Sequence, residues 1–126
     1  MIQNQRKLQK TFPISLIFEW FRQIVEAICF LHANKIIHRD IKPDNVFVTN
    51  KRQLKLGDLG TAKSLECLSK MNTFVGTVCY MSPEILRGQS YNHKTDIWSA
   101  GCVLYEMRTL DRLFKKDSSL LNIVSN

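Results

Sequence analysis

The chain has 126 residues, of which 44% are hydrophobic and 23% charged, and this balance indicates a soluble globular domain with a core of its own. Its formal net charge of +7 comes from 18 Lys and Arg against 11 Asp and Glu. The basic residues are scattered, with no run longer than two, so the charge forms no focused stripe. We interpret it as an ordinary solvated surface rather than a binding face for an anionic partner such as nucleotide phosphate.

The cysteines and histidines show neither a metal-ligand spacing nor a C-x-x-C pair; they are Cys29, Cys67, Cys79, Cys102, His32, His38 and His93. We expect free thiols in a reducing cytosol or nucleus. The residues after Met1 are polar and basic, unlike a signal peptide, and no uncharged apolar run could span a bilayer. The chain is therefore expected in the cytoplasm, without a membrane partner.

Residues 1–12 show no clear period, and a helix is predicted after them, with Pro13 and Ser15 in its first turn and its end at 32–34. The apolar stripe of this helix is wide enough for a core helix, and its aromatic residues are expected to pack; the stripe contains Ile17, Trp20, Phe21, Ile24, Val25, Ile28, Phe30 and Leu31.

The next segments predict short strands at 36–37, 46–49 and 54–56, the last two forming a hairpin around a turn at 50–53. A long loop is predicted over 60–81, and then a short helix over 83–87 that Gly88 ends.

A strong helix is predicted from about Thr95 to about Leu110, in which Gly101 indicates close backbone packing, and another helix could start at Asp117 or Ser118. The expected fold is mainly α with short β-hairpins (α+β), in one unit over residues 1–126.

One stretch carries an unusual mixture of chemical groups: His38-Arg39-Asp40-Ile41-Lys42-Pro43-Asp44-Asn45. It resembles the catalytic loop of protein kinases, H-R-D-x-x-x-x-N. The resemblance implies that Asp40 is the catalytic base, that Asn45 ligates magnesium and that Lys42 places a positive charge on the transferred phosphoryl group. A lysine two residues after the aspartate, followed by proline, is the serine/threonine-kinase pattern. The alternative, a turn with exposed charges, would not need this combination.

Gly57-Asp58-Leu59-Gly60 follows Asn45 closely and resembles the Asp-Phe-Gly motif of the same family, with leucine in place of phenylalanine. Alone such a motif is weak, because Asp and Gly are common in turns. At the end of a predicted hairpin it implies that Asp58 is a second magnesium ligand. Phe47, in the strand before it, is implied as the floor of the adenine pocket. The expected cofactors are therefore ATP and Mg2+.

Ser82-Pro83-Glu84 resembles the Ala-Pro-Glu motif that closes the kinase activation segment, which would then run from Asp58 to Glu84. The resemblance implies that Thr77 lies beside Asp40 and Lys42. It also makes Thr73 a regulatory phosphorylation site whose phosphate could pair with Arg39. The alternative for Thr73 is an exposed loop hydroxyl that is never modified.

Asp96-Ile97-Trp98-Ser99-Ala100-Gly101 matches the D-x-W-S-x-G helix of the family. It implies that Asp96 hydrogen-bonds the backbone of the catalytic loop and keeps it rigid. With His38 and Glu84, Asp96 makes up the implied structural residues of the site.

Together these motifs resemble the C-terminal lobe of eukaryotic protein kinases, and among them the NIMA-related kinases. Leu59 is one departure from that group. Val78-Cys79 is the other, since the group typically has proline and tyrosine at these two positions, and the peptide preference is therefore open. No G-x-G-x-x-G and no V-A-I-K-like strand occurs, since these belong to an N-terminal lobe that precedes this region. The arginine that pairs with Glu84 in the family also lies outside the chain. This polypeptide alone is expected to bind ATP poorly and to fold marginally.

Two hypotheses follow. The first is a serine/threonine kinase acting on protein Ser/Thr hydroxyls, with an activating protein partner left open and a location in the cytoplasm, the nucleus or at the cytoskeleton or centrosome. The second is a truncated, non-catalytic lobe that acts as a binding or regulatory module. A nucleic-acid binder is disfavoured, because no groove-reading motif occurs and the aromatic residues lie in core stripes.

Overall fold

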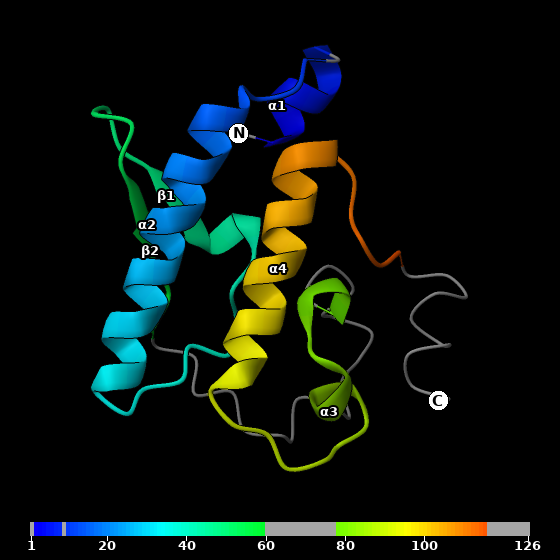
Figure 1. Ribbon diagram of the computed structural model, residues 1–126. Coiled ribbons are helices and arrows are strands. Elements are labelled where there is room, and N and C mark those ends of the chain that lie inside the picture. Colours follow the sequence, from blue (N-terminus) through cyan, green and yellow to red (C-terminus); the bar gives the residue numbers. More distant parts are fainter. Residues whose placement is uncertain (1, 9, 60–77, 116–126) are drawn as a thin grey trace.

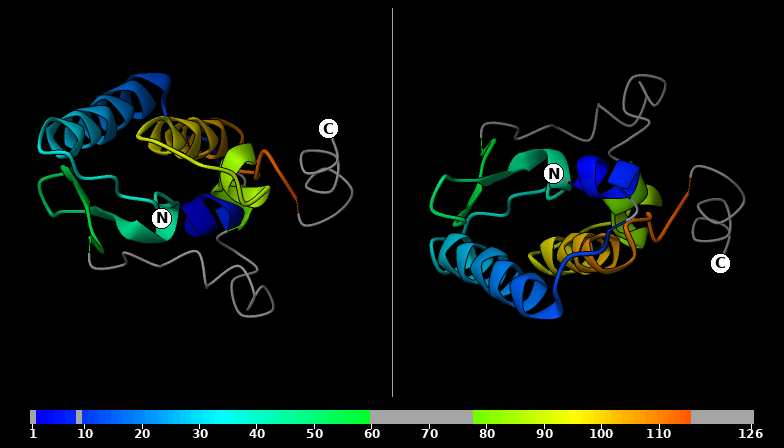
Figure 2. Two further views of the ribbon diagram at one scale, coloured as in Figure 1. Left: turned by 90° about the horizontal axis from the view of Figure 1, so that it is seen from below. Right: turned by 90° about the horizontal axis from the view of Figure 1, so that it is seen from above.

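The computed structural model describes residues 2–8, 10–59 and 78–115. Its two long helices, α2 (Ile14–Ala33) and α4 (Lys94–Thr109), lie side by side, as Figures 1 and 2 both show. The antiparallel hairpin of β1 (Val46–Val48) and β2 (Leu54–Leu56) packs against α2. The described part is therefore mostly helical with one two-stranded sheet, which agrees with the α+β prediction.

Helix α2 forms where the apolar stripe predicts it, with Pro13 as the N-cap and Asn34 as the C-cap. The buried residues of the stripe recur at helical spacing and face the core; they are Ile17, Trp20, Ile24, Ile28 and Leu31. One part of the prediction is wrong, because Phe30 is 69% exposed and does not pack. The stripe is narrower than its sequence suggested, since Phe30 lies at its margin.

The hairpin pairs Val46 with Leu56 and Val48 with Leu54. Two side chains of α2 form hydrogen bonds with backbone groups of this hairpin. The indole N–H of Trp20 donates to the carbonyl of Arg52 at 3.0 Å, and the backbone N–H of Leu54 donates to Oε1 of Gln23 at 2.7 Å. These bonds satisfy backbone groups that a short two-stranded sheet leaves unpaired.

The predicted strand at Ile36-Ile37 is wrong, because these residues lie outside the sheet. The N–H of Ile36 instead donates to the carbonyl of Leu31 at 2.9 Å, which closes the end of α2. The next residue, His38, donates its N–H to a side chain of α4. Within the described residues this segment therefore forms a loop rather than a strand.

Helix α4 buries Ala100, Cys102, Val103 and Met107 in the hydrophobic core. The expected close backbone packing at Gly101 is wrong for the described part of the chain, in which no atom lies within 4 Å of a Cβ built there and the residue is exposed. Leu110 caps the helix in the left-handed conformation at φ 59°. The boundaries of α4 agree with the prediction.

Three smaller elements complete the described part. Helix α3 (Pro83–Leu86) is followed by Gly88 at φ 65°, as predicted. A short 3₁₀ turn, Val78–Tyr80, lies inside the stretch predicted as loop. Helix α1 (Ile2–Leu8) was missed, since its sequence has no apolar period, although Ile2 is buried in the core. The predictions for residues 60–77 and for a helix from 117 or 118 fall outside the described residues.

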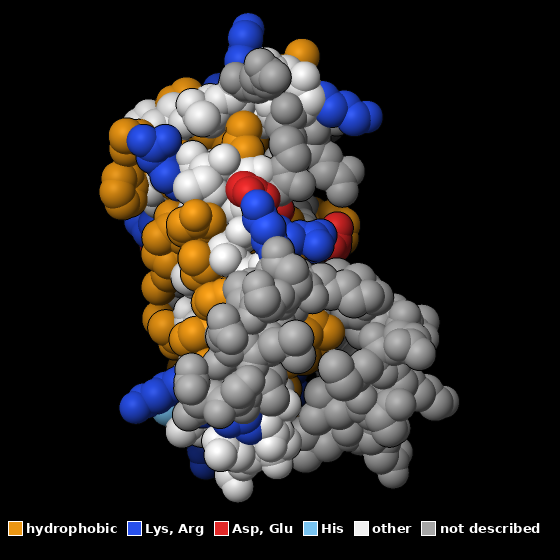
Figure 3. All heavy atoms as spheres, turned by 90° about the vertical axis from the view of Figure 1, so that its right-hand side faces the viewer, with side chains coloured by type: hydrophobic (Ala, Val, Ile, Leu, Met, Phe, Trp, Pro, Cys, Tyr) orange, Lys and Arg blue, Asp and Glu red, His pale blue; other side chains and the backbone are white. Residues whose placement is uncertain are grey.

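Hydrophobic side chains reach the surface on the side of the molecule that faces right in Figure 1, as Figure 3 shows. Large exposed hydrophobic residues of the described part include Phe18, Phe47, Leu59, Ile97 and Tyr105. Within the described ranges no helix combines the length and the apolar composition that a membrane crossing requires.

Candidate active site

The loop of residues 38–45 joins α2 to the hairpin, and the buried ring of His38 fixes its start. The backbone N–H of Asp40 donates to Nδ1 of His38 at 3.3 Å. The other ring nitrogen, Nε2, lies 2.9 Å from the carbonyl oxygen of Gly57. Since a carbonyl only accepts, His38 carries its proton on Nε2 and donates it to Gly57. One imidazole thus ties Asp40 to the residue just before Asp58.

The carboxylate of Asp40 is buried and lies among polar groups of its own loop. Nδ2 of Asn45 donates to the Asp40 carbonyl at 2.8 Å and to its Oδ2 atom at 3.0 Å. Nζ of Lys42 lies 3.2 Å from the same Oδ2. The 3₁₀ turn Pro43–Asn45 makes this possible, because it folds Asn45 back over the loop. A carboxylate held in one orientation beside an ammonium group can accept a proton from a bound hydroxyl.

The hairpin brings Asn45, Phe47 and Asp58 to one region. The N–H of Gly57, which follows β2, donates to the carbonyl of Asn45 at 2.9 Å. A Cβ at Gly57 would lie 2.6 Å from Cε2 of the Phe47 ring, so glycine is what allows this close approach. Asp58 is exposed, and its φ of 59° puts it in the left-handed region that aspartate tolerates better than most residues.

The oxygen atoms available here suit a hard cation. With Nδ2 of Asn45 engaged by Asp40, its Oδ1 is the atom that could ligate a metal, together with the Asp58 carboxylate. Within the described residues no group of three His, Cys, Asp or Glu could hold a metal ion. Two protein oxygens fit Mg2+, which usually keeps water and takes further ligands from phosphate groups.

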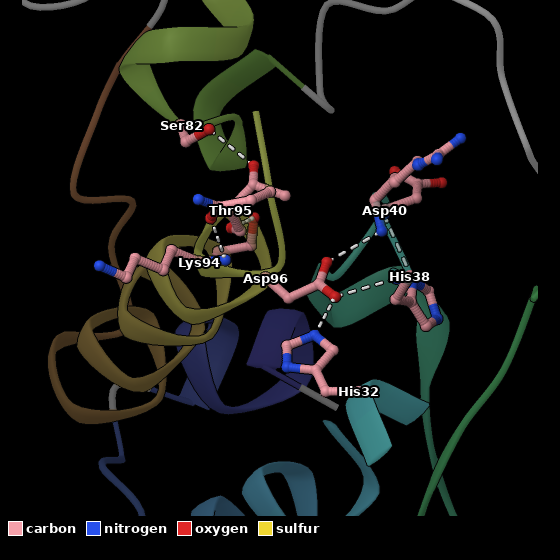
Figure 4. Close-up of polar contacts among 10 residues, drawn as sticks. His32, His38, Asp40, Ser82, Lys94, Thr95 and Asp96 are labelled. Carbon is pink, nitrogen blue, oxygen red and sulfur yellow. Dashed lines mark hydrogen bonds and ion pairs between the residues drawn. The ribbon is translucent and has the colours of Figure 1, made fainter. Parts of the chain in front are cut away.

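Asp96, in the first turn of α4, joins that helix to the loop. Its carboxylate accepts the backbone N–H groups of His38 and Arg39, each at 2.9 Å, although it is only 1% exposed (Figure 4). Arg39 adopts φ 69°, which is uncommon for a residue with a Cβ, so the loop is strained where Asp96 holds it.

His32, at the end of α2, also contacts this carboxylate, with Nε2 2.8 Å from Oδ2 of Asp96. Its ring packs edge-on against His93 at 5.3 Å between centroids. The sequence reasoning missed this contact. The only signal in the sequence was a single histidine near the end of a predicted helix. A contact between residues 64 positions apart cannot be derived from that signal.

Segment 78–83, which contains the 3₁₀ turn and the start of α3, is fastened to α4. Oγ of Ser99 donates to the carbonyl of Tyr80 at 2.7 Å, and the hydroxyls of Ser82 and Thr95 lie 2.6 Å apart. The Tyr80 hydroxyl donates to the buried Glu106 carboxylate. Burial and this neighbour raise the pKa of Tyr80 far above its ordinary value. None of these contacts was predicted.

A cavity of about 300 Å³ is lined by residues of α1, α2, the loop, the hairpin, segment 78–83 and α4. Pro43 and Asp44 line it from the loop, and Tyr80 from the segment, with Glu106 and Met107 of α4 behind them.

The remaining predicted site residues are spread out. Glu84 lies half-buried in the first turn of α3. The guanidinium of Arg39 lies 5.5 Å from the centroid of the Tyr91 ring, a cation–π contact. Thr73 and Thr77 lie outside the described residues.

The chain belongs to the protein kinase domain family, whose model matches residues 2–126. It is 47% identical over 111 residues to the serine/threonine-protein kinase Nek4 of Mus musculus, covering 86% of this chain and 14% of that protein. It is 40% identical over 120 residues to nekl-2 of Caenorhabditis elegans, covering 90% and 34%, respectively. Nek9 of Xenopus laevis is 50% identical over 110 residues, covering 86% and 12%.

These relatives confirm the predicted resemblance to the NIMA-related serine/threonine kinases. The chain spans only 12% to 34% of the length of these three curated relatives.

Proposed function

We propose that this chain is the C-terminal-lobe part of a serine/threonine protein kinase that transfers phosphate from ATP to hydroxyl groups of proteins. The observation that carries the proposal is the arrangement around Asp40. Its buried carboxylate is oriented by Asn45 and lies 3.2 Å from the Lys42 ammonium, while His38 links its backbone to the residue before Asp58. A turn with solvated charges would not bury and orient an aspartate in this way.

In this proposal Asp40 accepts the proton of the substrate hydroxyl and orients its oxygen for attack. Lys42 supplies positive charge near the transferred phosphoryl group. Asn45 and Asp58 would hold Mg2+, which when bound neutralises charge on the nucleotide phosphates. The exposed ring of Phe47 would support the adenine base.

Arg39 and the two threonines Thr73 and Thr77 are proposed as regulatory residues. The side chain of Arg39 is exposed and its guanidinium lies over the Tyr91 ring, so a phosphate could recruit it. A phosphate on Thr73 would add nearly two negative charges, which Arg39 could pair. Protein substrates with Ser or Thr, and an activating partner, are part of the same proposal.

The test uses the protein in its full natural length and measures phosphate transfer to matched serine, threonine and tyrosine peptides while Mg2+ is varied. We expect transfer to serine and threonine but not tyrosine. Asp58→Asn should raise the Mg2+ concentration needed for half-maximal rate, because it removes a charged ligand. Asp111→Asn, the same change at an exposed acid paired with Lys115, is the control and should leave the Mg2+ requirement unchanged. Transfer to tyrosine alone, or no transfer, would contradict the proposal.

A non-catalytic binding module is the second candidate, and the exposed hydrophobic residues favour it. Phe47 is 56% exposed and Leu59 57% exposed. Exposed large hydrophobic side chains are typical of surfaces that bind a partner. A comparison of the parent with a variant that lacks Asp40 distinguishes the two functions. A binding module would retain its cellular effect in this variant, whereas a kinase would lose it.

A further inference from the structure

The first turn of α4 and the segment just before it both contact the start of loop 38–45. Asp96 accepts the backbone N–H groups of His38 and Arg39, as described above (Figure 4). Tyr91, which lies outside any helix, contacts the side chain of the same arginine, with its ring centroid 5.5 Å from the guanidinium carbon. Arg39 is therefore held from this side both by its backbone and by its side chain.

The backbone of Arg39 depends on such contacts, because its φ of 69° lies in the left-handed region. This conformation is unfavourable for a residue with a Cβ and persists only where the surroundings hold it. Rotation about this φ would turn the peptide group that leads into Asp40, whose backbone N–H donates to Nδ1 of His38 at 3.3 Å. The orientation of Asp40 thus depends on what keeps Arg39 in place.

The contact between Arg39 and Tyr91 is an attraction between a cation and the face of an aromatic ring. The face carries negative potential, which attracts a guanidinium within about 6 Å of the ring centroid. An exposed arginine side chain has many rotamers in solvent, and a half-buried ring such as that of Tyr91 selects among them. The ring therefore restricts Arg39 through the electrostatics of its face.

The segment that carries Tyr91 is itself fixed in place. The ring of His93 packs edge-on against His32 of α2, with 5.3 Å between centroids. Asn92 bonds the start of α4, because its Oδ1 accepts the N–H of Lys94 at 2.9 Å and its carbonyl accepts the N–H of Thr95 at 3.1 Å. Tyr91 can therefore act as a fixed platform for the arginine.

We propose that Tyr91 is a positioning residue for Asp40 and acts through Arg39. Its ring holds the guanidinium of Arg39, and this keeps the strained backbone in the conformation that presents the Asp40 carboxylate. The inference rests on the proposed kinase function, in which Asp40 accepts the hydroxyl proton. It applies to the unphosphorylated protein, because the phosphate proposed above would offer Arg39 another partner.

The experiment measures kcat, KM for ATP and KM for a serine peptide from initial rates of the full-length protein after phosphatase treatment. Tyr91→Phe keeps the ring, and Tyr91→Leu removes it. A trifluorophenylalanine at residue 91 keeps the shape of the ring but cancels the negative potential of its face. Tyr105→Leu makes the same change at an exposed tyrosine of α4 and serves as the control.

We expect Tyr91→Phe to keep the parent kcat and Tyr91→Leu to lower it about two- to five-fold, the effect of losing one exposed cation–π contact. The trifluorophenylalanine variant should match Tyr91→Leu, because its ring packs but does not attract the cation. Both KM values should stay at the parent level. In an Arg39→Met background, Tyr91→Leu should have no further effect, because the cation is already absent. Tyr105→Leu should keep the parent kcat.

If Tyr91→Leu does not fold, the trifluorophenylalanine variant carries the test, because its shape is that of phenylalanine. An active parent whose trifluorophenylalanine variant keeps the Tyr91→Phe rate would overturn this inference alone. A rise in both KM values would also overturn it, since it would indicate a general loss of structure. So would a parent that is active only when phosphorylated, because Tyr91 would not then hold Asp40 in place. A parent inactive in both states would overturn the proposed function, and this inference with it.

Discussion

The Asp96 carboxylate accepts the backbone N–H of His38 at 2.9 Å, across 58 positions of the chain. A second bond, from the N–H of Arg39, uses its other oxygen. A buried carboxylate that accepts several N–H groups replaces the hydration it lost, and it fixes the backbone that donates them. The position of Asp40, next along the chain, therefore depends on helix α4.

Asp96→Asn should destabilise this arrangement, because the amide nitrogen that replaces one oxygen cannot accept a backbone N–H. We expect a loss of about 2–4 kcal/mol in the free energy of unfolding, since hydrogen bonds to buried charged groups contribute more than neutral ones. Chemical denaturation measures it, with the exposed Asp111→Asn as control. A loss no larger than that of the control would show that these bonds do not hold the loop.

Gly57→Ala should disturb the nucleotide site more than the fold. The new Cβ would lie 2.6 Å from Cε2 of Phe47, whose exposed ring can move away. We expect a KM for ATP at least about three-fold higher, because small displacements in a site have large effects on binding and rate. In a Phe47→Leu background the same change should have little further effect, since the clash is gone. An unchanged KM for ATP in Gly57→Ala would argue against Phe47 as the adenine floor.

Gly101→Ala should stabilise the protein. No atom of the described residues lies within 4 Å of the added Cβ, and the site is an exposed position inside α4. Alanine favours a helix over glycine by about 0.8–1 kcal/mol. Thermal and chemical denaturation should both show higher stability. A destabilised Gly101→Ala would mean that another part of the protein packs against this face.

Some features of the fold could be predicted from the sequence, and others, such as the surroundings of Gly101, could not. The boundaries of α2 and α4 follow from local apolar spacing and end signals, and the hairpin from two short strands around a turn. The packing of Gly101 could not be predicted, because it depends on which face of α4 has a neighbour. The exposure of Phe30 could not be predicted for the same reason, because it depends on which face of α2 has a neighbour.

Within the site, the motifs predicted which residues of the loop matter, because their spacing along the chain is local. They also predicted that Asp96 bonds the backbone of the loop, as it does, but they did not predict the other side-chain contacts around it. The contacts of His32 with Asp96 and of Ser82 with Thr95 join residues 64 and 13 positions apart, and serine, threonine and histidine occur in many roles. Such contacts follow only from the packing of α2, α3 and α4 together.

Alkaline pH should destabilise the protein through Cys102. Burial raises the pKa of the Cys102 thiol to about 11, from 9.0 in the unfolded chain. The folded state therefore holds this proton more tightly, so its contribution to stability is complete below pH 9 and is lost as the pH rises towards 11.

The slope of the unfolding free energy against pH should accordingly be steeper in the parent than in Cys102→Ala between these limits. Cys29→Ala, which changes an exposed thiol, provides the control and should keep the parent slope. Identical slopes in the parent and Cys102→Ala would contradict the assignment.

The most direct test of the central claim is the rate of phosphate transfer to a serine peptide by the full-length protein and by its Asp40→Asn variant. Asn keeps the size of the side chain but cannot accept the hydroxyl proton, so we predict a kcat lower by about 10²- to 10⁴-fold. The Asp111→Asn control should keep the parent rate. Equal rates in the parent and Asp40→Asn would contradict the account, since Asp40 could not then be the base.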